Sequence, residues 1–517
     1  MDAARPFFIT TPIYYVNDMP HLGHAYTTVA CDAMARFMRL DGRCVKFLTG
    51  TDEHGQKVAQ SAAAAGVSPQ EFADRNSARF REITRLLNIS QDEFIRTTEP
   101  RHARAVQALW QELEHRGEIY LGRFAGWYAV RDEAFYDESE LVNGPTGPRA
   151  PTGAEVEWLE EENYFFRLSA WQDRLLAYYD ANPEAVAPRA RRNEVISFVR
   201  GGLKDLSISR TSFTWGVPVP GHPGHIIYVW LDALINYITA AGYPDDPAGF
   251  SHWWPAALHM VGKDIVRFHS VYWPAFLMAA GLEPPRRVFA HGWWTVEGEK
   301  MSKSLGNFIP PQQLVDTYGV DPVRYFMLRE LPFGSDGDFS HRAVVGRLNG
   351  DLANDFGNLA QRVLVMINRD CGAAVPEPAT FADADRSLLD NARGLLQDLR
   401  VQMREQAFHL ALETIWRVVA EANRYVDEQA PWALRRTDPA RMRTVLYTLA
   451  EAIRHLALLT QPFVPQAAAK LLDQLAVPAD ARNFSALTAS LVPGTRLPKP
   501  QGIFPRFVEA PAIAASA

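Results

Sequence analysis

The sequence has few cysteines, no long apolar run and no excess of basic residues. The three cysteines, Cys31, Cys44 and Cys371, are far apart, so they form no paired metal-binding spacing, and their odd number fits poorly with a disulfide framework. We therefore expect a protein of a reducing compartment, the cytoplasm. No apolar run approaches the roughly 18 residues of a membrane span. The N-terminus also lacks the basic-then-apolar build of a secretion signal.

The charge balance excludes a protein that is basic over its whole surface. The net charge is −7, so no basic field over the whole chain indicates nucleic-acid binding. Any such binding must come from local basic patches. The length of 517 residues predicts several domains rather than one core.

The hydrophobic pattern changes along the chain and predicts two fold classes. Residues 6–10 and 44–50 are β-rich, and the segment between them has apolar residues four apart, which predicts a βαβ unit and a parallel sheet. Residues 117–225 are rich in aromatics, glycine and proline, which predicts an insertion with its own small β-structure. After about residue 350, apolar residues recur at helical spacing and predict antiparallel packed helices. We therefore expect a Rossmann-type parallel-sheet catalytic domain, split by an insertion and followed by an all-α bundle.

These changes of pattern set the predicted domain boundaries. From the N-terminus they give a first catalytic half, an insertion, a second catalytic half, a linker, a helical domain and a tail. The corresponding ranges are 1–116, 117–225, 226–296, 297–349, 350–490 and 491–517.

The segment "HLGH" at 21–24 stands where a predicted strand gives way to a predicted helix. Gly23 has no Cβ and allows a ligand to approach the backbone closely. A helix N-terminus offers free N–H groups and partial positive charge, which suit a phosphate, and His21 and His24 add two hydrogen-bond donors. The alternative is structural: His21 caps the helix, and His24 packs under the sheet.

A second candidate segment, "EGEKMSKSLGNF", begins at Glu297. Lys300 and Lys303 lie in a stretch rich in glycine and serine, and such lysines can close on a polyphosphate and neutralise its charge. The alternative is a solvated lysine loop. Because the histidine segment belongs to the first catalytic half and this one follows the second, both can flank one ligand at the switch point of the sheet.

The two segments together carry a resemblance. "HLGH" with "KMSKS" is the signature pair of class I aminoacyl-tRNA synthetases, and the sequence resembles the methionyl branch of that family over residues 6–465. The blocks that carry this closer likeness are "TTPIYYVND", "TGTDEHG", "ISRTSFTWGVPVPGHPGHIIYVWLDALINY", "VGKDIVRFHSVYWPA" and "DEQAPW".

The resemblance implies a two-step reaction at one ATP site. A methionine carboxylate attacks the α-phosphate of Mg-ATP, and the terminal ribose of a methionine tRNA, with a CAU anticodon, then takes the methionyl group. The resemblance implies that ATP contacts His21, Gly23, His24, Lys300, Ser302 and Lys303. It also implies that Asp264 and Arg210 help to fix the substrate carboxylate and the adenylate.

The resemblance further implies a pocket for the methionine side chain. Aliphatic walls and aromatic edges suit a long unbranched thioether. The positions that match the family's pocket are Ile13, Tyr15, Trp230, Ala233, Leu234, Tyr237, Ile265, Phe268 and His269. Asp52 matches the residue that pairs with the substrate ammonium group. Each of these residues alone has an ordinary alternative, as core packing or as a helix cap.

For the tRNA, the resemblance implies that Asn358, Arg362 and Trp432 read the anticodon. Their structural alternatives are a solvated helix face and a capping hydrophobe. No cysteine occurs between residues 117 and 225, so we expect no structural zinc in the insertion. No further module appears after about residue 490, and we expect a monomer.

Two other functions compete with this one. A free-standing nucleotidyltransferase would use an HxGH loop but would not need the lysine segment, the insertion and the helices. A catalytically inactive paralogue that only binds tRNA would not need His21, His24, Asp52, Lys300 and Lys303.

Overall fold

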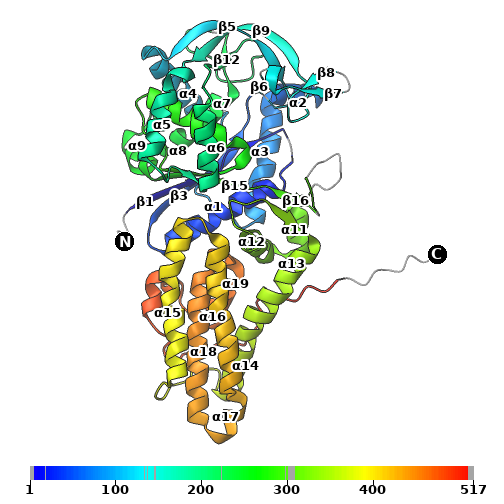
Figure 1. The fold of residues 1–517 in the computed structure, drawn as a ribbon. Coiled ribbons are helices and arrows are strands. Elements are labelled where there is room, and N and C mark those ends of the chain that lie inside the picture. The colour runs from blue at the N-terminus through cyan, green and yellow to red at the C-terminus, as the bar shows by residue number, and fades with distance from the viewer. Residues whose placement is uncertain are drawn as a thin grey trace, which may run out of the picture.

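The structure is a computed structural model, and it describes residues 5–17, 19–132, 134–136, 138–144, 147–222, 224–296, 298–300 and 309–509. The molecule is elongated: an α/β part lies at one end and a helical bundle at the other (Figure 1). The predicted fold class is confirmed, because a parallel sheet is followed by a separate set of long helices.

A seven-stranded parallel sheet forms the centre of the α/β part. Its order is β10-β15-β14-β1-β3, with β2 and β4 both pairing with β3. The strands are β1 (Pro6–Thr10), β2 (Tyr14–Tyr15), β3 (Cys44–Asp52), β4 (Glu93–Arg96), β10 (Val186–Ala187), β14 (Ala257–Gly262) and β15 (Arg287–His291). The helices of this part are α1 (Leu22–Leu40), α2 (Gln56–Ala64), α3 (Pro69–Leu86), α4 (Pro100–His115), α5 (Gln172–Ala181), α6 (Arg189–Arg200), α7 (Val229–Leu234), α8 (Asn236–Ala241), α9 (Pro247–Trp253) and α10 (Trp273–Ala279).

The predicted βαβ unit is present. β1 pairs in parallel with β3, and α1 connects them. Thirteen of the nineteen residues of α1 are buried, because the helix is covered by the sheet on one side and by later helices on the other. The strand β4 extends this sheet, since it pairs in parallel with β3.

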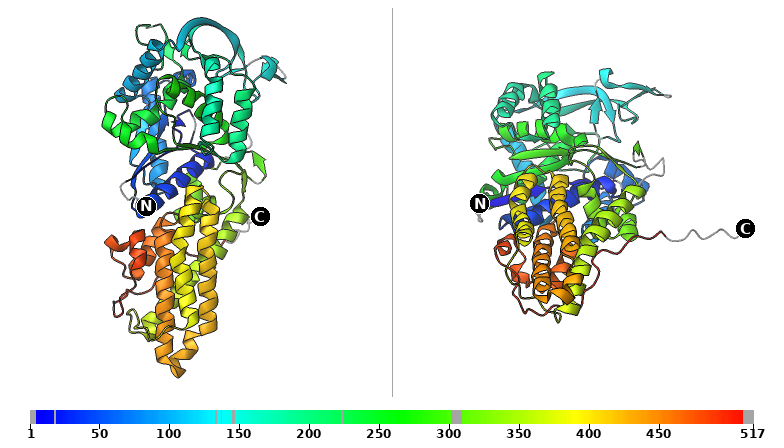
Figure 2. Two further views of the ribbon diagram at one scale, coloured as in Figure 1. Left: turned by 60° about the vertical axis from the view of Figure 1, so that its left-hand side comes forward. Right: turned by 60° about the horizontal axis from the view of Figure 1, so that its bottom comes forward.

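The range 117–225 contains an antiparallel sheet that arches over the far side of the α/β part (Figures 1 and 2). Its strands are β5 (Ile119–Ala129), β6 (Ala134–Tyr136), β9 (Glu157–Phe166) and β11 (Leu206–Ser207), with the small pairs β7 (Val142–Gly144)–β8 (Gly147–Arg149) and β12 (Ser209–Arg210)–β13 (Ile226–Ile227) nearby. The same range also contributes α5, α6 and β10, and β10 pairs with β15 of the parallel sheet.

A linking region and the bundle complete the fold. The linking elements are β16 (Trp294–Val296), β17 (Glu299–Lys300), α11 (Pro311–Tyr318), α12 (Val320–Arg329), β18 (Gly337–Phe339), α13 (His341–Arg347) and the π-helical η6 (Leu348–Gly357). The bundle helices are α14 (Asn358–Asp370), α15 (Asp383–Arg404), α16 (Phe408–Gln429), α17 (Pro431–Thr437), α18 (Pro439–Thr460) and α19 (Pro465–Gln474). In Figure 1, α17 lies at the end of the bundle farthest from the sheet.

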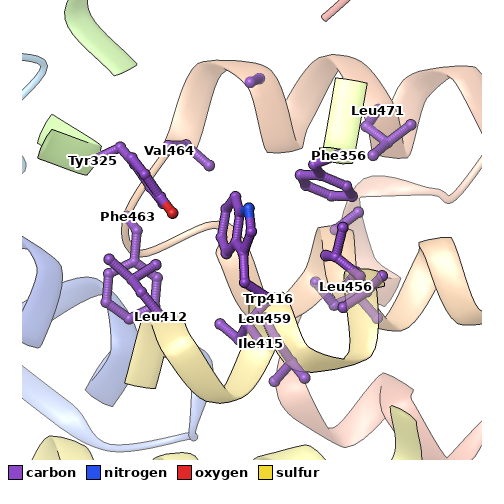
Figure 3. Packing of buried hydrophobic residues seen from close by; sticks show 14 of the residues in the cluster. Tyr325, Phe356, Leu412, Ile415, Trp416, Leu456, Leu459, Phe463, Val464 and Leu471 are labelled. Carbon is purple, nitrogen blue, oxygen red and sulfur yellow. The ribbon is translucent and has the colours of Figure 1, made fainter. Parts of the chain in front are cut away.

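The two parts are joined by a buried core. Trp416 of α16 packs against Tyr325 of α12 and Phe356 of η6, with ring centroids 4.7 and 5.9 Å apart (Figure 3). Deeper still, the fully buried Arg324 of α12 donates to Asp32 of α1 at 2.6 Å. This arginine lowers the pKa of Asp32 against the opposing effect of burial. Arg324 also donates to the carbonyl oxygens of Pro462 and Phe463, between α18 and α19, at 3.0 and 3.2 Å. Through this arginine, the bundle is tied to the helix that starts at the histidine segment.

The C-terminal segment runs back along the molecule. Residues 503–509 pack on the linking region, where Phe507 lies against Tyr318 of α11 and His341 of α13. Residues 510–517 lie outside the described residues. In the part of the chain that the structure describes, no helix is long and apolar enough to cross a membrane.

Candidate active site

The "HLGH" segment forms the start of α1. His21 is the N-cap, and its Nδ1 accepts a hydrogen bond from the Gly23 N–H at 3.0 Å. The His24 Nδ1 accepts from the His21 N–H at 3.2 Å, which makes the cap reciprocal. A Cβ at position 23 would lie 2.9 Å from the His21 ring, so glycine keeps this ring in place. The structure therefore shows the capping role that was the alternative for His21.

The cap also prepares the two rings for a ligand. Because each Nδ1 accepts a hydrogen bond, the network assigns the proton of each neutral ring to Nε2. The rings stack with centroids 3.8 Å apart. Burial and the neighbouring His21 hold the pKa of His24 well below its usual range, so His24 is neutral near pH 7. Two oriented N–H donors at the positive end of a helix suit a phosphate.

A cavity of about 260 Å³ lies at the carboxyl ends of β1 and β14. The chain leaves β1 toward β3 and leaves β14 toward β15, so this is the switch point of the sheet. All ten residues predicted around the methionine line this cavity: Ile13, Tyr15, Asp52, Trp230, Ala233, Leu234, Tyr237, Ile265, Phe268 and His269.

Two lining residues, Arg131 and Asp132, come from the turn after β5 and were not predicted. Arg131 pairs with Asp132 at 3.1 Å, and Asp132 also accepts from the Tyr136 hydroxyl at 3.0 Å. The insertion therefore closes one wall of the cavity. No local pattern marks this pair, because only the fold of the antiparallel sheet brings it to the switch point.

Tyr237 and His269 face each other at the cavity wall. The His269 Nδ1 lies 3.0 Å from the Ile265 carbonyl oxygen, which can only accept, so Nδ1 carries the proton. The His269 Nε2 then accepts from the Tyr237 hydroxyl at 2.7 Å. Burial lowers the pKa of His269 to about 4 and raises the pKa of Tyr237. Both groups are neutral near pH 7, which suits an uncharged thioether.

The local backbone explains how Phe268 and His269 reach the cavity together. Both belong to η5 (Phe268–Tyr272), a π-helical turn that leads into α10. A π-turn rotates the following side chains relative to a regular helix and is frequent at functional sites. Phe268 packs directly on Trp230 of α7 and forms the aromatic wall.

Asp52 ends β3, and a buried network fixes the residues that follow it. Glu53 is fully buried and accepts two hydrogen bonds from Arg96, at 2.7 and 2.9 Å, and one from Thr98 at 2.6 Å. Its backbone N–H donates to Thr97 at 2.9 Å. The carboxylate of Asp52 is thus presented to the cavity by a rigid strand end.

A second buried network joins this strand end to α7. Asp232 accepts from His54 at 2.6 Å and from His102 at 2.8 Å, and all three side chains are buried. Burial opposes the charge of Asp232, but the two histidines outweigh it and lower the pKa of Asp232 to about 2. No local sequence pattern marks these three residues, because they are up to 178 residues apart.

The two other predicted catalytic residues, Asp264 and Arg210, lie in different surroundings. Asp264 lines a second cavity of about 930 Å³, which shares Trp230, Ile265 and Phe268 with the first. Its carboxylate accepts from the Trp293 indole at 3.0 Å. Arg210 lines neither cavity: it is fully buried, and its guanidinium lies 4.0 Å from the Tyr228 ring. Its Nη1 donates to the Ser207 hydroxyl at 3.0 Å, and Ser207 lines the second cavity, so the predicted role of Arg210 stays a prediction.

The lysine segment is described only at its start. Lys300 is the last residue of β17, and its backbone pairs with Thr295 of β16; its side chain, Ser302 and Lys303 lie outside the described residues. The chain reaches β16 from the carboxyl end of β15, where His291 lies 2.7 Å from Thr27 of α1. Trp294 of β16 also packs against Tyr26 of α1, so the strand that leads toward the segment lies beside the first turns of that helix.

The predicted anticodon residues lie on the bundle. Asn358 and Arg362 share one face of α14, and Arg362 pairs with Asp427 near the end of α16 at 3.0 Å. Trp432 follows in α17, and 49% of its surface is exposed. Trp432 thus lies on α17, which Figure 1 places at the end of the bundle farthest from the parallel sheet.

Comparison with known families follows the same division of the chain. Residues 7–364 match the family described as tRNA synthetases class I (M). Residues 375–512 match the anticodon binding domain of methionyl tRNA ligase.

Individual relatives match over nearly the whole length. The methionine–tRNA ligase of Mesorhizobium japonicum is 60% identical over 508 residues, which cover 98% of both chains. That of Mycobacterium leprae is 56% identical over 97% of this chain and 95% of its own. A solved structure of Mycobacterium tuberculosis methionyl-tRNA synthetase with methionyl-adenylate superposes with a TM-score of 0.95 at 56% identity, covering 97% of this chain and 100% of that chain.

Proposed function

Because this chain belongs to the methionine–tRNA ligases of class I, we propose that it joins L-methionine to methionine tRNA at the expense of ATP. The observation that carries the proposal is the cavity at the switch point. Ten residues from four separate stretches of the sequence line this one cavity.

In the first step, a carboxylate oxygen of methionine attacks the α-phosphorus of ATP, and the bond to the bridging oxygen breaks to release pyrophosphate. The Asp52 carboxylate holds the ammonium group, and the neutral Tyr237–His269 wall receives the side chain. His21 and His24 donate from Nε2 to phosphate oxygens, and Lys300 and Lys303 neutralise the leaving pyrophosphate. Positioning and charge stabilisation suffice, so no enzyme nucleophile is needed.

In the second step, a hydroxyl of the terminal tRNA ribose attacks the adenylate carbonyl carbon, and AMP leaves. The far end of the bundle selects the tRNA through Asn358, Arg362 and Trp432. An exposed tryptophan can stack on an unpaired base, and Arg362 is held in place by Asp427 before any RNA arrives.

Mg²⁺ enters this scheme with ATP. Mg²⁺ prefers oxygen ligands and keeps several waters, so the phosphates supply its main ligands. Among the described residues, no group of three or more His, Cys, Asp or Glu side chains is arranged to hold a metal ion. We also expect no structural zinc, since the range 117–225 has no cysteine. Metal analysis of the purified protein tests this, and one zinc per chain would contradict it.

We further expect a cytoplasmic monomer. Its three cysteines are unpaired, as in a reducing compartment. Size-exclusion chromatography with light scattering tests the oligomeric state, and a mass near twice 58.0 kDa would contradict a monomer.

Methionine-dependent ATP–pyrophosphate exchange tests the proposed function. We expect exchange with methionine and none with other amino acids at equal concentration. A nucleotidyltransferase would exchange only with its own acceptor metabolite and would not respond to methionine, and an inactive paralogue would not exchange at all. Exchange stimulated best by another amino acid would refute the assigned substrate.

A further inference from the structure

An arginine-rich cavity of about 410 Å³ lies at the edge of the sheet opposite the methionine pocket. Arg5 precedes β1, Arg43 precedes β3, and Arg286 precedes β15, so these side chains gather at the amino ends of parallel strands. The methionine pocket is at the carboxyl ends, about 15 Å away over the five residues of β1. The bundle contributes the other side through Arg400 and Arg404 of α15.

The inner wall of this cavity is fixed by ion pairs. Arg400 donates two hydrogen bonds to one Asp41 oxygen, at 2.6 and 3.0 Å, and Asp41 is almost fully buried. Arg287 pairs with Glu184 at 3.1 Å and donates to the carbonyl oxygen of Arg404 at 3.0 Å. The cavity is therefore a preformed feature of the junction between the sheet and α15.

The rim carries positive charge that the protein does not compensate. Within the described chain, Arg5, Arg286 and Arg404 make no hydrogen bond or ion pair with their side chains, although all three line the cavity. Burial and the nearby Arg287, Arg5 and Arg43 lower the pKa of Arg286, against a smaller opposite effect of Glu184. Six arginines and two carboxylates, Asp41 and Glu184, line the cavity, so an anion that enters it offsets an excess of positive charge.

We propose that this cavity is a second ligand site, which binds a polyphosphate group. Guanidinium groups bind phosphate oxygens in pairs, and several converging arginines favour a ligand with more than one phosphate. The shared chemistry is a phosphate chain, whether inorganic or part of a nucleotide. A ligand bound there contacts the sheet through Arg5 and Arg286 and the bundle through Arg404, so it ties the two parts together and stabilises the native state.

Calorimetric titration of the full chain tests the site. Inorganic tripolyphosphate and GTP are the probes, and a non-hydrolysable methionyl-adenylate analogue occupies the catalytic site. The triple variant Arg5→Gln, Arg286→Gln, Arg404→Gln should bind tripolyphosphate at least about tenfold more weakly. The control removes the same charge from three exposed arginines elsewhere, Arg85→Gln, Arg386→Gln and Arg393→Gln, and should change binding by less than about twofold.

The two probes identify the source of the phosphate chain. Equal affinity for tripolyphosphate and GTP supports an inorganic ligand, and tighter binding of GTP supports a nucleotide. The proposal is overturned if neither probe binds, if the analogue abolishes binding, or if both triple variants lose the same affinity. It is also overturned if the three arginines affect the binding of a tRNA transcript but not the binding of either probe, because the cavity is then an RNA contact.

A thermal measurement separates binding from folding. Without ligand, both triple variants should melt within about 2 °C of the unaltered protein, because surface substitutions change stability little. Tripolyphosphate should raise the melting temperature of the unaltered protein and the control but not that of the cavity variant. A rise of equal size in all three proteins would contradict the site.

Discussion

The proposed methionine pocket and the proposed anticodon surface (Asn358, Arg362 and Trp432) are built in opposite ways. The pocket is a cavity lined mainly by buried and half-buried side chains, and its Tyr237 hydroxyl already has a partner, His269. The anticodon surface is more open to solvent: Arg362 pairs with Asp427, whose carboxylate is 64% exposed. The proposed site for the small ligand is thus a preformed cavity, whereas the proposed surface for the RNA consists of side chains that water also reaches. Substitutions should cost far more in the pocket than on the surface.

The largest effect is expected at Asp52, the carboxylate of the pocket. Asp52→Ala should lower kcat/KM for methionine in pyrophosphate exchange by about 10³-fold, or about 4 kcal/mol, because a buried ammonium group then has no counter-charge. Asp74→Ala is the control, since this half-exposed residue pairs with Arg96 outside the cavity. A loss below about tenfold at Asp52 would show that the ammonium group binds elsewhere.

The buried Asp232 network should matter more for stability than the exposed pair on the surface. Asp232→Asn should destabilise the region of α7 and the end of β3 by about 3 kcal/mol, since breaking a buried charge network is costly. Asp427→Asn removes an exposed partner of Arg362 and should cost less than about 1 kcal/mol. Amide hydrogen exchange in the two regions measures both. An equal loss of local stability in the two regions would mean that burial does not decide how much each charged pair contributes.

Low pH should lower the free energy of unfolding through His269 in the pocket and not through the residues of the anticodon surface. His269 has a native pKa of about 4, against an ordinary value of about 6.5 when the chain is unfolded. Below pH 6.5 the unfolded chain binds a proton that the native chain does not, so stability falls by about 1.4 kcal/mol per pH unit and by about 3 kcal/mol at pH 4. The anticodon surface has no histidine among its three residues.

Unfolding measured between pH 7 and 4.5 checks this difference. The slope should be shallower in His269→Gln, in which the titrating group is absent. A slope unchanged by this substitution would assign the acid sensitivity to other buried histidines, such as His259, whose pKa burial also lowers.

The pocket was also the part that could be predicted from the sequence. The strands β1 and β3 and the helix α1 show a clear apolar period, and the residues of the pocket stand in long blocks that resemble the family. The strands β4 and β10 have four and two residues and show no period. Contacts between residues far apart in the sequence could not be predicted either. Arg131 of the insertion lines the pocket, and His54 forms a hydrogen bond with Asp232.

The active-site role of Arg210 stays a prediction. It stands in the block "ISRTSFTW", and the resemblance assigns it to the active site. The structure buries it beside Tyr228, where its guanidinium donates to Ser207, a residue that lines the second cavity, at 3.0 Å. A matching position alone does not say which neighbour a side chain contacts.

On the anticodon surface, the expected effect is moderate. Trp432→Ala should lower kcat/KM for tRNA charging by about 2 kcal/mol, the range of one base stacked on an aromatic ring, and should leave pyrophosphate exchange unchanged. Trp158→Ala is a matched control, because Trp158 is also about half exposed but lies in the insertion. A parallel fall in exchange would place Trp432 in the folding of the bundle rather than in RNA recognition.

The smallest effect is expected at the Tyr237 hydroxyl, and it decides how the pocket recognises sulfur. This hydroxyl already donates to His269, so in the observed arrangement it has no hydrogen to offer the thioether. Tyr237→Phe leaves the buried Nε2 of His269 without a donor, at a cost of about 1 kcal/mol. This cost falls on the free and the bound enzyme alike, so the KM values for methionine and for norleucine, which has a methylene in place of sulfur, should both change by less than about twofold, and the preference for methionine should not change. Tyr243→Phe, outside the cavity, should alter neither value. A rise in the KM for methionine alone would mean that the hydroxyl turns toward sulfur when the substrate binds. The pocket would then rearrange on binding and would not be preformed, which contradicts the contrast with the anticodon surface.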